Sequence, residues 1–277
     1  MDVRPSPIAG TWYPDNPQNL TRDLNQYLAH AHVQLPTGKV WGVVVPHAGY
    51  RYSGPVAAYA FKCLRGLRPD LVVIVAPLHA NHHAPLLTTA HEAYETPCGI
   101  VEVAAQAVDK LNRALQARLG YGLTTVRGDS EHSVEIELPF LQHVLGKFRL
   151  LPVMIRAQRV PVAEALGQAL AEILRGQQVL LVASSDLSHF YPQARAREFD
   201  KALLHHLTAF DPHGIIDAEE QGLGFACGRG AIAAVLWATK HLGADRVSVL
   251  RYATSGDVTG NFNTVVGYGA AIIWQAL

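Results

Sequence analysis

The sequence predicts an α/β protein, a single three-layer domain in which helices cover a central, mostly parallel sheet. Two observations predict this fold class. Short apolar runs of strand length alternate with longer stretches of helical period, which is typical of strand–helix–strand units and therefore of parallel strands. No segment rich in proline and serine divides the 277 residues, so we expect one domain over residues 1–277.

The first strand–helix–strand unit spans residues 40–76. The runs VWGVVV (40–45) and LVVIVA (71–76) are apolar throughout, as expected of strands that are buried on both faces. Between them, Ser-Gly-Pro at 53–55 predicts a helix start, since serine can cap a helix and proline suits its first turn. The apolar face of this helix is predicted to contain Val56, Ala60 and Leu64.

The same alternation continues to the C-terminus. The predicted helices are 104–119, 130–144, 162–174, 194–210 and 229–242. The predicted strands are 149–155, 179–183, 247–252 and 265–273. Together these elements complete the three layers of one domain.

Composition argues against several classes of protein. The 23 basic residues equal the 23 acidic ones, and no basic run offers a face for nucleic acid. A net charge near zero gives no long-range repulsion, so a homo-oligomer is one expectation. The apolar runs are shorter than the ~20 residues that span a bilayer, so we expect no membrane partner. Three scattered cysteines and an N-terminus without a signal-type stretch indicate a cytoplasmic protein.

Ionisable side chains follow four of the predicted strands. Because ligands of open α/β sheets bind beyond the carboxyl ends of the strands, we expect these groups to meet. In chain order they are His47, His79, Asp186 with His189, and Asp257. His82 and His83 come shortly after His79 and are alternatives to it, but His79 is preferred because it is nearest to its strand. Tyr50, close behind His47, is a further candidate for the same pocket.

Cys227 stands just before the predicted helix 229–242, within the glycine-rich stretch GFACGRG. A thiol at a helix N-terminus is expected to have a lowered pKa, and Arg229 would reinforce this. The alternative is a small residue that packs a helix start. Cys98 has no comparable setting, and Cys63 lies on a predicted helix where packing explains it.

His132 and Glu135 are three residues apart and would share one face of the predicted helix 130–144. A metal-bound histidine needs a carboxylate or carbonyl partner, so the pair is a candidate for that supporting role. A surface ion pair is the alternative.

Seven stretches of the chain together resemble the Memo family, also called AmmeMemoRadiSam system protein B. They occur in the expected order over nearly the whole chain. They are IAGTWYP (8–14), PHAGYRYSG (46–54), PLH (77–79), ETPCGIVEV (95–103), EHSVEIELPFLQ (131–142), SSDLSHF (184–190) and CGRGAI (227–232).

The resemblance implies the fold of the LigB-type class III extradiol dioxygenases, which hold non-haem Fe(II) with two histidines and a glutamate. By motif, His47 and His79 match the metal histidines, and Cys227 stands where those enzymes have their carboxylate. His189, with Asp186, matches the acid/base position. The family also implies radical-SAM and AMMECR-type proteins as partners. One transition-metal ion is therefore expected, Fe(II) preferred, with Cu or Zn as alternatives because a thiolate is a softer ligand.

Three functional hypotheses follow. The leading one is a metal-dependent redox or dioxygenase-like enzyme that acts on a small organic substrate. In it, His47, His79 and Cys227 bind the metal, while His189, oriented by Asp186, is the general acid/base. A zinc-dependent hydrolase would use the same three ligands and an activated water. A non-enzymatic protein would bind a peptide or other ligand in the same pocket. Metal identity separates the first two, and retention of a peptide without turnover would indicate the third.

Overall fold

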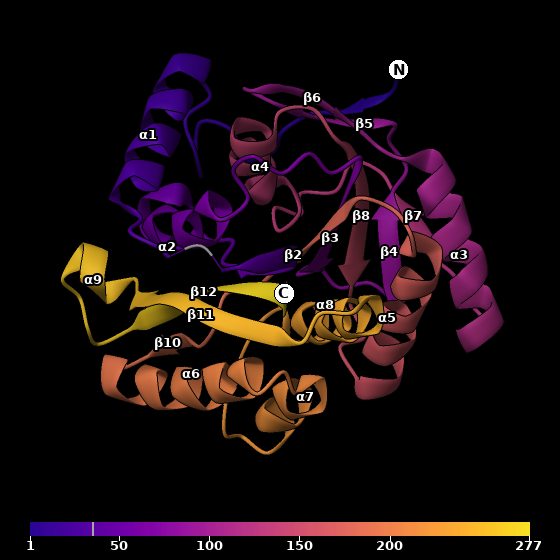
Figure 1. Ribbon diagram of the computed structural model, residues 1–277. Helices are drawn as coiled ribbons and strands as arrows, with labels where there is room; N and C mark the ends of the chain where they lie inside the picture. Colours follow the sequence, from indigo (N-terminus) through magenta and orange to yellow (C-terminus); the bar gives the residue numbers. More distant parts are fainter. Residues whose placement is uncertain (35) are drawn as a thin grey trace.

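Four parallel strands in the order β2–β9–β3–β8 form the centre of the sheet in this computed structural model, which describes residues 1–34 and 36–277 (Figure 1). Their bounds are β2 Gly38–Val45, β3 Leu71–Pro77, β8 Arg149–Ile155 and β9 Val179–Ser184. Every residue of β3 and β9 is buried, as strands covered on both faces require. The predicted apolar strands are confirmed.

Antiparallel pairs flank this centre, so the sheet as a whole is mixed. On one side β12 (Val265–Ala276) pairs with β2, and both β11 (Arg246–Thr254) and β10 (His189–Tyr191) pair with β12. On the other side β4 (Leu86–Thr89) is antiparallel to β8 and carries β7 (Thr124–Val126). Residues 255–264 alone connect β11 to β12, which is too short for the crossover that parallel strands need.

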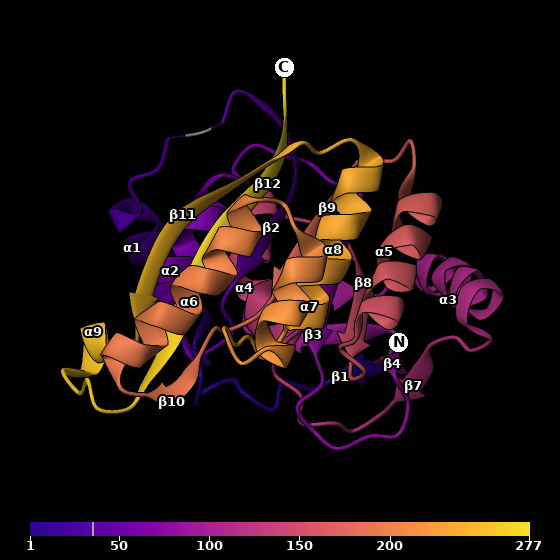
Figure 2. The same ribbon diagram turned by 90° about the horizontal axis from the view of Figure 1, so that it is seen from below.

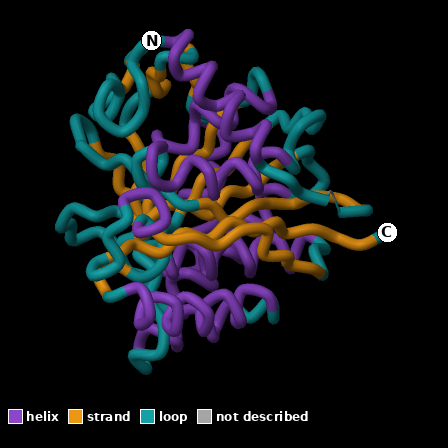
Figure 3. Tube along the Cα trace, turned by 90° about the vertical axis from the view of Figure 1, so that its left-hand side faces the viewer, coloured by secondary structure: helices purple, strands orange, loops and turns teal. Residues whose placement is uncertain are grey.

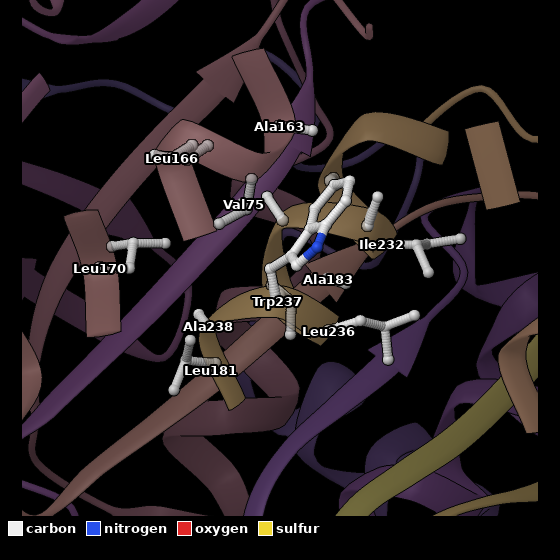
Figure 4. Close-up of a cluster of buried hydrophobic side chains, with 14 of the residues drawn as sticks. Val75, Ala163, Leu166, Leu170, Leu181, Ala183, Ile232, Leu236, Trp237 and Ala238 are labelled. Carbon is white, nitrogen blue, oxygen red and sulfur yellow. The ribbon is translucent and has the colours of Figure 1, made fainter. Parts of the chain in front are cut away.

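Helices cover both faces of the sheet, which confirms the three-layer prediction (Figures 1, 2 and 3). One face carries α1 Pro17–His30, α2 Tyr50–Lys62 and α4 Leu138–Leu145. The other carries α3 Ala105–Leu119, α5 Val160–Leu174, α6 Gln193–Thr208, α7 Pro212–Glu220 and α8 Arg229–Leu242. Each face of the sheet has its own hydrophobic core, the first under α1, α2 and α4 and the second under the other five helices. In β3, Val72 and Ile74 pack into the first core, whereas Val73 and Val75 pack into the second. Figure 4 shows Trp237 of α8 within that second core.

Two helices begin at residues other than those predicted. The helix predicted at 130–144 begins only at Leu138, after a 3₁₀ turn over Glu135–Glu137. The Glu131 carboxylate accepts the backbone N–H groups of the next two residues, which favours a turn over a helix there. Helix α2 begins at Tyr50, not near Ser53, and contains Pro55. No predicted element corresponds to α1, to α7 or to the small sheet of β1 Val3–Arg4, β5 Ala93–Thr96 and β6 Gly99–Glu102.

No helix in the described ranges 1–34 and 36–277 has the length and apolar character needed to cross a membrane.

Candidate metal centre

His47 lies just beyond the end of β2 and is 1% exposed. Its backbone N–H donates to the Asp186 carboxylate over 2.8 Å. Its ring Nδ1 is 2.9 Å from Oγ of Ser184, the last residue of β9. The sheet register places Val45 opposite Ser184, so the two strands end side by side and bring these groups together. His47 is thus held at both its backbone and its ring.

His79 follows β3, the next strand beyond β9, and its side chain is 39% exposed. The Glu131 carboxylate holds it at two points, since it accepts the backbone N–H over 2.6 Å and lies 2.9 Å from Nδ1. This hydrogen bond orients the ring and leaves Nε2 free to bind an ion. Burial alone would lower the pKa of His79, but the bond to Glu131 raises it above its ordinary value.

Cys227 lies in the loop before α8, with its Sγ 3.1 Å from Nε2 of His47. The Gln158 side chain holds the loop, donating to the Cys227 carbonyl over 2.6 Å and accepting the N–H of Gly230 over 2.8 Å. A Cβ on Gly228 would lie 2.5 Å from the Ser184 carbonyl oxygen. The loop can therefore approach β9 only because residue 228 has no side chain.

The ligand atoms of His47, His79 and Cys227 all lie within 4.8 Å of one another. Among the described residues, no lysine or arginine forms an ion pair or side-chain hydrogen bond with these three. Two imidazole nitrogens and a sulfur suit a transition metal such as iron, copper or zinc. A second grouping of His79, Glu131 and His132 also has the spacing of metal ligands. Glu131, however, is already bonded to Nδ1 of His79, which is the role of a supporting carboxylate.

His132 stacks on His79, with ring centroids 4.7 Å apart, and its ring centroid lies 4.1 Å from that of Trp12. Burial lowers the pKa of His132 to about 4. The expected partnership with Glu135 is wrong, because residues 130–134 are not helical and Nδ1 of His132 lies 3.4 Å from Glu131. The carboxylate beside His132 is therefore Glu131 and not Glu135.

His189 begins β10, and its Nδ1 is 2.7 Å from the Leu187 carbonyl oxygen. A carbonyl can only accept, so the ring proton is on Nδ1 and Nε2 is free to take a proton. The predicted contact from Asp186 is not formed. The Asp186 carboxylate bonds instead to the backbone of His47 and Ala48, and burial raises its pKa to about 7. Leu187, not Asp186, therefore orients His189.

Three further predicted pocket residues form contacts of other kinds. Glu135 is fully buried and accepts hydrogen bonds from Arg4, Ser6 and Tyr13. The Tyr50 hydroxyl donates to the Ile136 carbonyl over 2.7 Å. Asp257 lies in the short helix α9 (Gly256–Thr259), where its carboxylate accepts the N–H of Thr254. Within the described residues, none of these three side chains forms a hydrogen bond with His47, His79 or Cys227.

A family model described as Memo-like protein matches residues 4–272. The chain belongs to the Memo family. A MEMO1 family protein of Nitrosopumilus maritimus is 34% identical over 275 residues, covering 97% of this chain and 98% of the relative. One of Methanopyrus kandleri is 35% identical and covers 96% of both chains. The crystal structure of the uncharacterized protein JW3007 from Escherichia coli K12 has a TM-score of 0.51 at 13% identity. It covers 84% of this chain and 100% of that protein, and shows a shared fold only.

In this Memo-family centre, the expected lowering of the Cys227 pKa is wrong. Burial raises the pKa of the thiol well above its usual range, and the Asp186 carboxylate adds to that rise. Arg229, expected to assist, forms an ion pair with Glu219 instead. Burial also lowers the pKa of His47 well below its ordinary value. For Cys227, desolvation thus outweighs the helix dipole.

Four residues around the candidate ligands were not predicted from the sequence: Ser184, Glu131, Glu137 and Gln158. Ser184 was left just beyond the predicted strand 179–183, whereas β9 includes it. Glu131 and Glu137 lie within the motif EHSVEIELPFLQ, where spacing alone cannot tell which carboxylate faces a histidine. No sequence pattern indicates a role for Gln158, because that role depends on contact with a loop 69 residues away.

Proposed function

We propose that this protein binds one transition-metal ion through His47, His79 and Cys227, and that it is a redox or dioxygenase-like enzyme acting on a small organic substrate. The observation that carries the proposal is the convergence of three ligand atoms within 4.8 Å of one another, from three separate loops at one sheet edge. Family membership supports it through the matching motifs around all three residues.

Fe(II) is the preferred ion, with Cu and Zn as alternatives. When bound, such an ion would supply redox or Lewis-acid chemistry beside the open edge of the sheet. His79 and Glu131 support a divalent cation, since a carboxylate behind a ligating imidazole strengthens the imidazole as a donor. A sulfur donor in place of a carboxylate also suits Cu(I) and Zn.

His189 is the proposed general base. Its Nδ1–H is committed to Leu187, and its Nε2 can accept a proton from substrate. Burial is the main cause that lowers the pKa of His189 below its ordinary value, and the nearby charge of His79 adds to it. The ring is therefore neutral at neutral pH and able to accept a proton. Replacement of a positioned base costs on the order of 10²–10⁴ in rate. His189→Ala should therefore keep the metal and lose turnover.

A zinc hydrolase is the second candidate, because catalytic zinc is typically held by three protein ligands, histidine and cysteine among them, with water in the fourth position. The donor set of His47, His79 and Cys227 is compatible with it. Iron or copper in anaerobically purified protein would favour the redox enzyme, whereas zinc alone would favour the hydrolase.

Elemental analysis of anaerobically purified protein tests the proposed ligands. Wild-type protein should hold about one ion per chain, and His47→Ala and Cys227→Ser should lose it. Matched controls are His205→Ala, on the exposed side of α6, and Cys63→Ser, just after the end of α2, which should keep the ion. Unchanged metal content in His47→Ala and Cys227→Ser would overturn the proposal.

A further inference from the structure

The hydroxyl of Ser184 makes three short polar contacts in the buried layer behind His47. Its Oγ lies 2.9 Å from Nδ1 of His47, 2.7 Å from the Ser133 carbonyl oxygen and 2.7 Å from Oε1 of Glu137. Ser184 is fully buried and Glu137 is 1% exposed. These groups must therefore act as hydrogen-bond partners for one another, because a buried polar atom without a partner lowers stability.

A count of protons decides the direction of each bond. The hydroxyl has one proton to donate, and a carbonyl oxygen can only accept. If Glu137 were ionised, Ser133 and Glu137 would both need that one proton. If Glu137 holds a proton, it donates to Ser184, and Ser184 donates to Ser133. The second lone pair of Oγ then accepts Nδ1–H of His47, and every group is satisfied.

We propose that Glu137 is a positioning residue that acts as a hydrogen-bond donor to Ser184 and thereby fixes the tautomer of His47. With the proton on Nδ1, the Nε2 lone pair of His47 faces Sγ of Cys227 at 3.1 Å, where an ion would bind. The effect on metal affinity rests on the proposed function. The protonation of Glu137 and the His47 tautomer are properties of the protein itself.

The surroundings of Glu137 agree with a neutral carboxyl. No lysine, arginine or histidine within the described ranges forms an ion pair with it, in contrast to Glu135, whose carboxylate lies 2.6 Å from Arg4. Burial, the largest effect, raises the pKa of Glu137 well above its usual range, and the Asp186 carboxylate adds to it. An isolated carboxylate in such a place would keep its proton.

Infrared difference spectroscopy at neutral pH tests the protonation directly. We expect metal-free wild-type protein to show the carbonyl stretch of a protonated carboxylic acid, and Glu137→Gln to remove that band. Glu135→Gln, at an equally buried but ion-paired position, should leave it. In ¹⁵N NMR spectra His47 should carry its proton on Nδ1 in wild type and in Glu137→Gln, whose amide can still donate. Absence of a band that Glu137→Gln removes, or an Nε2–H tautomer in wild type, would overturn the proposal.

Metal titration adds a second test through the conservative variant. Glu137→Gln should bind the ion as wild type does, while Glu137→Ala should lose about 10–100-fold in affinity, as removal of supporting groups typically does. Equal losses in both variants would show that a charged carboxylate is required and would contradict the proposal. If wild-type protein binds no metal yet shows the band and the Nδ1–H tautomer, the proposed function fails and the inference about Glu137 stands.

Discussion

Glu135 and Glu137 are both buried in one turn but belong to two different acidic clusters. In the first, Glu135 and Asp129 face the guanidinium of Arg4, at 2.6 Å and 2.8 Å. In the second, Glu137 and Asp186 lie behind His47 and have no basic partner from lysine or arginine among the described residues. The first cluster contains its own cation and is complete. Within the described ranges the second contains no such cation and is incomplete, and burial raises the pKa of both of its carboxyl groups.

The complete cluster has a structural role. Arg4 also donates to the carbonyl oxygens of Asp129 and Glu131, so it fastens the N-terminal segment to the loop that carries Glu131. Glu131 in turn holds His79. The two clusters are therefore connected, and damage to the first should affect stability before it affects the metal.

Arg4→Ala should have the largest effect on stability. It leaves the buried Glu135 carboxylate without its cation, which typically costs about 3–5 kcal/mol in free energy of unfolding. Urea denaturation measures the loss. The matched control is Arg22→Ala, whose ion pair with Asp23 is exposed and should contribute less than about 1 kcal/mol. Similar losses for the two variants would remove the contrast between the clusters.

A metal ion held by His47, His79 and Cys227, in front of the incomplete cluster, should stabilise the protein because it binds only the folded state. At a free ion concentration 100-fold above Kd, the gain in free energy of unfolding is about 2.7 kcal/mol. We expect this gain in wild type, seen as a rise in Tm, and its absence in Cys227→Ser. Removal of the ion with a chelator should reverse it. An equal rise in Cys227→Ser would place the binding elsewhere.

Gly228→Ala should displace the loop that carries Cys227 without removing a candidate metal ligand. Its Cβ would lie 2.5 Å from the Ser184 carbonyl oxygen, so the Cys227 loop must move. Such overpacking costs about 1–3 kcal/mol in stability, and we expect metal affinity to fall with it. Gly224→Ala, in the same loop, meets its nearest atoms at 3.4 Å and is the control. Normal metal affinity in Gly228→Ala would show that the loop tolerates displacement.

Asp211→Ala should have the smallest effect and lies away from both clusters. Asp211 caps α7, accepting the N–H of Gly214 over 3.0 Å, and loss of such a cap costs about 1 kcal/mol. Partial burial would raise the pKa of Asp211, but the Gly214 N–H and His206 hold it below its ordinary value. A lowered pKa in the folded state means that this contribution is present at neutral pH and is lost as pH falls through that pKa. Stability curves of wild type and Asp211→Ala should therefore converge in acid; a constant difference would contradict the assignment.

The periodicity of apolar residues predicted the fold class. The residues that follow the predicted strands indicated that the candidate ligands lie at one edge of the sheet. The apolar runs 40–45, 71–76 and 179–183 are continuous because both faces of these strands are buried, and that pattern is local. The supporting groups depend on contacts between distant segments. Glu131 bonds to His79 across 52 residues, and Ser184 to His47 across 137. Spacing along the chain carries no signal for such pairs.

The pKa of Cys227 could not be predicted from its place before a helix. A helix N-terminus and a neighbouring arginine both favour a thiolate, and both are visible in the sequence. Desolvation of the thiol and the proximity of Asp186 oppose them, and neither is visible there. The sense of β11 and β12 likewise became clear only from the pairing of the strands.

X-ray absorption at the metal edge tests the central claim most directly, because it reports which atoms surround the ion. Anaerobically purified wild-type protein should show one sulfur at about 2.3 Å, if the ion is zinc, together with imidazole nitrogens at about 2.0–2.1 Å. Cys227→Ser, reloaded with the same ion, should lose the sulfur shell, whereas Cys63→Ser should keep it. A first shell of oxygen and nitrogen alone in the wild-type protein would contradict the assignment of Cys227 as a ligand.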